Sequence, residues 1–134
     1  MSALNLRTNK ATTYRFVVLA LAVSAGIIHL LLIPEHLAES TEAAIFFAVL
    51  GVAQIAFGIL FVLQPTKKLV IIGIIGNMGS IILYWVTRIA SLPEPFGTED
   101  IDAVGIVTKI IEISLVAVLI YLTIHFKKIK FVEA

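Results

Sequence analysis

The segment from His29 to Glu39 holds the densest group of metal-binding side chains in this chain of 134 residues. It reads His29-Leu-Leu-Leu-Ile-Pro34-Glu35-His36-Leu-Ala-Glu39, and imidazole and carboxylate groups are ligands for zinc, copper or iron. On a helix His36 and Glu39 could share one ion, and a complete site needs either a fold-back of the chain at Pro34 or added ligands from Glu94, Glu99, Asp100 and Asp102. We therefore predict a zinc or copper site at His29, His36 and Glu39, with helix capping and contact with water as the competing interpretation.

A second group consists of single polar side chains that interrupt long apolar stretches. Such side chains are costly in hydrocarbon, so they must face protein, water or one another. They predict an inward-facing polar network in which Arg88 and Lys109 are the partners of Glu112. The network would either hold the helices together through hydrogen bonds and ion pairs or conduct protons or ions. Its predicted members are Gln54, Asn77, Arg88, Lys109 and Glu112.

Several other kinds of chemistry are not expected. The chain has no cysteine, which excludes disulfides, thiolate metal sites and a cysteine nucleophile. It has no glycine-rich phosphate loop, no G-x-S-x-G motif and no H-E-x-x-H motif, so we do not expect an enzyme. A haem held by two histidines is not expected, because nearly a whole bilayer separates His125 from His29 and His36. The net charge of +1 offers no basic surface for nucleic acid.

The elements that must position these residues are apolar helices. Apolar residues make up 60% of the chain and charged residues 14%, against roughly 45–50% and about 25% in soluble domains. A helix needs about 20 apolar residues to cross a bilayer, and four stretches meet this requirement, the last of them with Lys109 and Glu112 inside it. We predict one all-α domain, residues 1–134, that forms an integral membrane four-helix bundle with spans at about 14–33, 43–64, 69–90 and 103–126.

The first apolar stretch has an alternative interpretation as a secretory signal. Basic residues precede it, and Val23-Ser24-Ala25 resembles a cleavage site of small residues. The apolar run continues for another eight residues, to Ile33, beyond that site. We therefore expect an uncleaved first span.

The basic residues near the predicted span ends gather on one side of the membrane. Lys67 and Lys68 lie between the second and third spans, on the side where the chain also begins and ends with clusters of Lys and Arg. The other side carries seven acidic residues, and Arg88 is its one basic residue near a span end. Because Lys and Arg are enriched at cytoplasmic ends, we predict a multi-pass plasma-membrane protein with both termini in the cytoplasm.

Small and aromatic residues indicate how the spans pack. Ala22 and Gly26 recur four apart in the first span, and Gly76 and Ser80 recur four apart in the third. Small residues let helices approach closely in a bilayer, so we expect the third span, which also holds Gly73 and Gly79, to be the central one. Tyr84 and Trp85, near the acidic end of that span, are typical of aromatic anchors at the headgroup boundary.

The pattern H-x4-P-E-H-x2-E, followed by Thr87-Arg88 and the K-x2-E motif of Lys109 and Glu112, resembles a family of small four-helix membrane proteins of bacteria and archaea. The resemblance covers most of residues 24–116. In those relatives an intramembrane Asp often precedes the Lys and Glu of the last helix, whereas this chain has Gly105 there. The composition, which favours Ile and Lys, also resembles that of the small helical proteins that accompany the ammonia monooxygenase of archaeal ammonia oxidisers.

The resemblance implies a non-catalytic accessory subunit, held in the lipid bilayer beside other membrane subunits of a complex such as a copper-dependent membrane monooxygenase. The alternative is a self-contained small membrane protein that binds a metal ion or moves a proton or ion through its His, Glu and Arg cluster. Co-purification distinguishes the two, because an accessory subunit has a stoichiometric partner.

Overall fold

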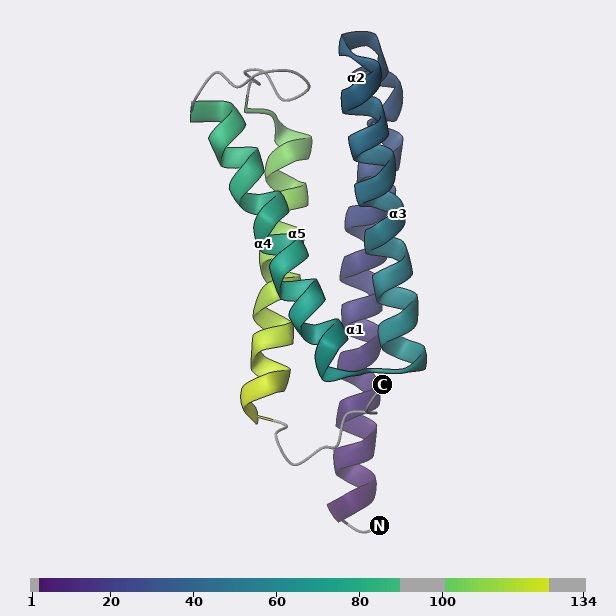
Figure 1. The fold of residues 1–134 in the computed structure, drawn as a ribbon. Helices are drawn as coiled ribbons and strands as arrows, with labels where there is room; N and C mark the ends of the chain where they lie inside the picture. Colours follow the sequence, from purple (N-terminus) through teal and green to yellow (C-terminus); the bar gives the residue numbers. More distant parts are fainter. Residues whose placement is uncertain (1–2, 90–100, 126–134) are drawn as a thin grey trace.

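The computed structural model describes residues 3–89 and 101–125, and within them it is all helical (Figure 1). Four helices are long and apolar enough to cross a membrane, over Thr12–Leu31, Thr41–Leu63, Lys67–Ile89 and Ala103–Ile124, the same number as the sequence predicts. The predicted span ends at residues 90 and 126 lie outside the described residues. The helices are α1 (Ala3–Leu31), α2 (Ile33–Glu39), α3 (Thr41–Leu63), α4 (Lys67–Ile89) and α5 (Ala103–His125).

The spanning helices form two antiparallel pairs, α1 with α3 and α4 with α5, and the contact between α1 and α5 joins the pairs. α1 is therefore the central helix, whereas the sequence pattern predicts this place for the third span, α4. From the short link at residues 64–66, α4 diverges from α3 and contacts it only sparsely (Figure 1). The two pairs are thus farther apart at the end of the molecule where α2 lies.

Short polar side chains begin two of the spanning helices. The Oγ of Ser40 accepts a hydrogen bond of 3.0 Å from the backbone N–H of Ala43 at the start of α3. Thr66 does the same for Leu69, at 3.1 Å, at the start of α4. Such caps satisfy backbone donors that have no partner within the helix, so they fix where each helix starts.

The small helix α2 continues the course of α1 with little interruption. Backbone hydrogen bonds of 3.1 Å run from Leu32 N–H to Ile28 and from His36 N–H to Leu32, across the junction between the two helices. Pro34 lies in the first turn of α2, where its missing N–H costs nothing. The chain therefore does not fold back at Pro34.

An apolar core fills the half of the bundle that lies away from α2. It consists of side chains from all four spanning helices, and Phe61, Leu115 and Leu119 within it are fully buried. The opposite sides of the helices expose large apolar residues such as Ile72 and Ile75, as expected for surfaces in contact with lipid. The core members are Val18, Ala22, Phe57, Phe61, Val70, Leu115, Leu119 and Leu122.

Candidate functional site

A buried polar network lies next to the apolar core, on the side of α2. Gln54 on α3 is its centre: its Nε2 donates to Glu112 Oε2 at 2.6 Å and to Asn77 Oδ1 at 3.2 Å. Its Oε1 lies 2.7 Å from His29 Nδ1. Each of the four spanning helices contributes one of these side chains, and all four are at most 5% exposed. The network therefore connects both helix pairs.

Lys109 and Glu112 form an ion pair on one turn of α5. The ammonium group contacts Glu112 Oε1 directly and donates a second hydrogen bond of 2.9 Å to Ser80 Oγ on α4. Both carboxylate oxygens of Glu112 thus receive a donor, one from Lys109 and one from Gln54. Glu112 is fully buried, so these hydrogen bonds replace the water that an ionised carboxylate requires.

The order of donors and acceptors within the network is fixed. A carboxylate only accepts hydrogen bonds, so the NH2 group of Gln54 must face Glu112, and its carbonyl oxygen must face His29. His29 Nδ1 therefore donates to Gln54. In the neutral ring the other nitrogen, Nε2, is then the one that accepts a proton.

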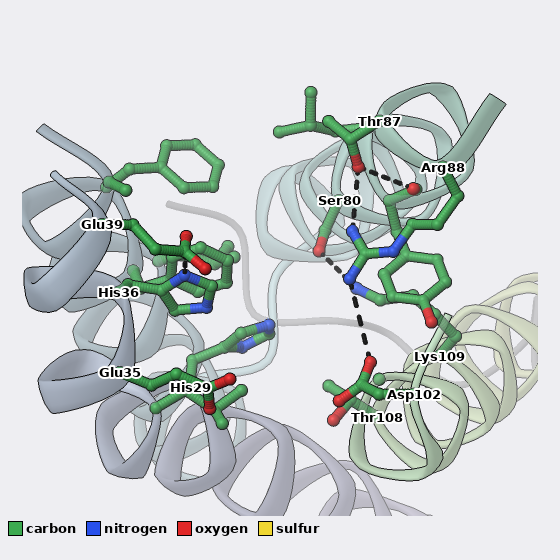
Figure 2. A pocket seen from close by; sticks show the side chains of 18 residues that line it. His29, Glu35, His36, Glu39, Ser80, Thr87, Arg88, Asp102, Thr108 and Lys109 are labelled. Atoms are coloured by element: carbon green, nitrogen blue, oxygen red, sulfur yellow. Dashed lines mark hydrogen bonds and ion pairs between the residues drawn. The ribbon is translucent and has the colours of Figure 1, made fainter. Parts of the chain in front are cut away.

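A cavity of about 260 Å³ lies above this network, between α1, α2 and α3 on one side and α4 and α5 on the other. Figure 2 shows two polar walls that face each other across it. His29, Glu35, His36 and Glu39 come from α1 and α2, and the opposite wall comes from α4, α5 and the residue before α5. The labelled side chains of that second wall are Ser80, Thr87, Arg88, Asp102, Thr108 and Lys109.

Arg88 lies in the cavity wall, and its interaction partners differ from Glu112, the partner that the sequence predicts. Its guanidinium lies 3.7 Å from the centre of the Tyr84 ring, and one of its nitrogens donates to Thr87 Oγ1 at 2.8 Å. The carboxylate of Asp102 is 3.8 Å away, which is an ion pair without a hydrogen bond. Of the two predicted cationic partners of Glu112, the structure thus brings only Lys109 to it.

The predicted metal ligands His29, His36 and Glu39 do not meet at one point. His29 faces Gln54, whereas His36 stacks on Phe47 with ring centroids 3.8 Å apart and lies 3.4 Å from Glu39. In the part of the chain that the structure describes, no three His, Asp or Glu side chains come close enough to hold a metal ion. The fold-back at Pro34 is absent, since α2 carries His36 onward along α3. Of the alternative ligands, Glu94, Glu99 and Asp100 lie outside the described residues, and Asp102 lies on the opposite wall of the cavity.

The side chain of Tyr84 is directed into the bundle, whereas that of the neighbouring Trp85 is exposed. Tyr84 is 7% exposed, and its hydroxyl has no hydrogen-bond partner among the described residues. Its ring packs where a side chain at residue 105 would lie, since a Cβ on Gly105 would be 2.6 Å from Tyr84 Oη. The intramembrane Asp that the resemblance implies at this position would have no space here.

Gly105→Ala is expected to displace Tyr84 and to destabilise the packing of α4 on α5. The added Cβ would meet Tyr84 Oη at 2.6 Å and Asp102 Oδ1 at 2.5 Å, and overpacking of this kind costs about 1–3 kcal/mol. Thermal unfolding of the detergent-solubilised protein measures the effect. Gly79→Ala is the matched control, because nothing lies within 4 Å of its added Cβ. Equal melting temperatures for the two variants would contradict this assignment.

The structure adds members that the sequence pattern did not single out for the site. Ser80 bonds to Lys109, Tyr84 and Thr87 surround Arg88, and Phe47 stacks on His36. Buried residues on α4 recur at three- or four-residue intervals, which is the one sequence signal that would place Ser80, Tyr84 and Thr87 on the inner face.

The fold and the site together define a class: a multi-pass α-helical membrane protein with a charged cavity at one end of its bundle and an apolar core at the other. No protein-family model, curated protein or solved structure matches this chain.

Proposed function

We propose that this chain is a self-contained membrane binding protein that admits protons, ions and small polar solutes from one side of the membrane as far as the Lys109–Glu112 pair. One observation carries the proposal. Lys109 of this buried pair forms part of the cavity wall, and so does His29 of the polar network. Intramembrane ionisable side chains that border a cavity are typical of binding sites and of proton or ion pathways.

The apolar core supports access from one side only. On every spanning helix the core residues lie toward the end away from α2: Phe57 and Phe61 follow Gln54 on α3, and Leu115 and Leu119 follow Glu112 on α5. These side chains pack without polar groups over several helical turns. Beyond Glu112 a solute therefore meets this apolar packing before it reaches the polar side chains Tyr14, Arg15 and Thr66 at the far end of the bundle.

The distribution of charged residues along the sequence indicates which end of the bundle faces which side of the membrane. Lys67 and Lys68 begin α4 at the core end, and Glu35 and Glu39 lie at the cavity end. Basic residues are enriched at cytoplasmic ends, so in our proposal both termini are cytoplasmic and the cavity opens to the outside of the plasma membrane. The basic residues Lys127, Lys128 and Lys130, on which the prediction also rests, lie outside the described residues.

Cysteine labelling tests this proposal directly, because the chain has no cysteine of its own. A charged thiol reagent that cannot cross membranes, applied outside the cell, is expected to label Leu83→Cys in the cavity wall. It is expected to label Gln64→Cys, at the end of α3 near Lys67, only after the membrane is opened. Leu119→Cys, at 0% exposure in the core, is the matched control that stays unlabelled on both sides.

Three results would contradict parts of the proposal. Labelling of Leu119→Cys as fast as that of Leu83→Cys would show that water passes through the core. Failure to label Leu83→Cys from either side would show that the cavity is closed. Labelling of Gln64→Cys from outside intact cells would reverse the assigned orientation.

The role as an accessory subunit of a membrane complex, such as a copper-dependent monooxygenase, stays a prediction. The exposed apolar sides of the spanning helices suit neighbouring subunits as well as lipid. Mild-detergent purification with mass spectrometry tests it, since an accessory subunit is recovered with a stoichiometric partner and a self-contained protein is recovered alone.

A further inference from the structure

The two walls of the cavity carry ionisable groups of opposite sign. The wall formed by α2 presents the carboxylates of Glu35 and Glu39, and the wall formed by α4 and α5 presents Arg88 and Lys109. The cavity lies between these two walls (Figure 2). A ligand that fills this space is in contact with acidic groups at one end and with basic groups at the other.

The basic wall holds hydrogen-bond donors that have no acceptor. Arg88 Nε and Tyr84 Oη are both buried, and neither has a hydrogen-bond partner within the described residues. Arg88 donates a hydrogen bond to Thr87, and its ion pair with the half-exposed Asp102 is long, at 3.8 Å. Arg88 itself lines the cavity and the anionic partner with which it pairs is distant, so this end of the cavity is suited to an anionic group that takes the place of Asp102.

The acidic wall is suited to a cationic group. Glu35 and Glu39 are exposed at the cavity side of α2, and Glu39 lies 3.4 Å from the imidazole of His36. Glu35 makes no ion pair within the part of the chain that is described. An ammonium group here would gain two carboxylate partners.

The remaining surface and the volume limit what lies between the two charged groups. Phe46, Phe47 and Leu50 of α3 face the cavity together with Leu83 of α4, so part of the wall is apolar. The volume of about 260 Å³ is below the roughly 300–1,000 Å³ of sites for drug-sized ligands. The occupant is therefore a small molecule or the headgroup of a larger one.

We propose that this cavity binds a small zwitterion, with its anionic group at Arg88 and Tyr84 and its ammonium group at Glu35 and Glu39. The inference rests on the proposed function, because the ligand must be able to reach the cavity. A soluble zwitterion and an aminophospholipid headgroup share this chemistry. The sparse contact between α3 and α4 leaves a side of the bundle through which the tail of a lipid could leave.

Protection of Leu83→Cys from the thiol reagent tests the inference. In vesicles of phosphatidylglycerol, phosphoethanolamine is expected to slow labelling, whereas inorganic phosphate or ethanolamine alone, at the same concentration, is not. Arg88→Gln is expected to abolish this protection, and so is the double variant Glu35→Gln/Glu39→Gln. Glu42→Gln, which removes an exposed carboxylate outside the cavity wall, is the matched control and keeps it.

A second arm separates the two sources of the zwitterion. If a lipid headgroup is the ligand, vesicles that contain phosphatidylethanolamine slow the labelling of Leu83→Cys before any soluble compound is added. If only the soluble compound binds, the lipid makes no difference. Each variant is also labelled without ligand, which shows that its cavity has formed.

The outcomes distinguish the inference from the proposed function. If inorganic phosphate alone or ethanolamine alone protects Leu83→Cys equally well, the inference that the ligand is a zwitterion is overturned. If Leu83→Cys is labelled from one side and no probe or lipid protects it, the zwitterion inference is overturned while the proposed function stands. Absence of labelling in phosphatidylglycerol vesicles would overturn both.

Discussion

Removing one member of the Lys109–Glu112 pair is expected to destabilise the protein more than removing both. Lys109→Met leaves the fully buried Glu112 with a negative charge and Gln54 as its only remaining donor. Glu112→Gln leaves the buried ammonium of Lys109 with neutral hydrogen-bond partners such as Ser80 and without its countercharge. An unpaired buried charge costs about 3–5 kcal/mol, so each single variant is expected to lose about this much stability.

The double variant Lys109→Met/Glu112→Gln carries no unpaired charge. The amide introduced by Glu112→Gln retains an oxygen that can accept from Gln54, so we expect the double variant to be more stable than either single one. The stability of all three variants is measured by thermal unfolding in detergent, with the fraction of monodisperse protein as the readout. Lys68→Met/Glu42→Gln is the matched control, because both residues are exposed and neither lies in the network. A double variant that loses as much stability as the two single variants added together would contradict the role of the ion pair.

The number and extent of the spanning helices could be predicted because each is a long stretch with few charges. The small helix α2 could not, since Ile33–Glu39 is too short to cross a membrane and its polar residues indicate an exposed segment. Its direction depends on packing against α3, where His36 stacks on Phe47. Contacts of this kind join residues on different helices, and the spacing within one segment does not contain them.

The same distinction holds within the site. The contact between Lys109 and Glu112 follows from their spacing of three on one helix, which places them on the same face. The link from His29 through Gln54 to Glu112 depends on the relative heights of α1, α3 and α5, which no single segment specifies. For this reason Arg88 could be predicted as a member of a polar group, but its actual partners could not.

The glycines of α4 show where composition misleads. The stripe of Gly73, Gly76 and Gly79 predicts close packing along the whole helix. A Cβ on Gly73 would lie 2.5 Å from the Phe57 ring, but Gly76 and Gly79 have nothing within 4 Å. These two glycines lie on the outer side of α4, where its distance from α3 leaves them without a protein neighbour.

A close contact between two glycine backbones joins α1 to α3, and filling it is expected to have a large effect. A Cβ on Gly26 would lie 2.6 Å from the backbone oxygen of Gly51, and a Cβ on Gly51 would lie 2.8 Å from that of Gly26. Backbone atoms cannot move aside as flexible side chains do, so Gly26→Ala and Gly51→Ala are each expected to lose about 1–3 kcal/mol. Gly76→Ala, whose Cβ meets nothing, is the matched control and is expected to unfold at an unchanged or slightly higher temperature.

This contact also sets the position of the polar network. Gly26 lies one turn before His29 on α1, and Gly51 lies one turn before Gln54 on α3, so the approach of the two backbones brings the imidazole within 2.7 Å of the amide. In Gly26→Ala and Gly51→Ala we therefore expect the hydrogen bond between His29 and Gln54 to lengthen. The nitrogen chemical shifts of the His29 ring measure this change, and Gly76→Ala is expected to leave them unchanged. Loss of stability with unaltered His29 shifts would show that the glycines pack the two helices without positioning the site.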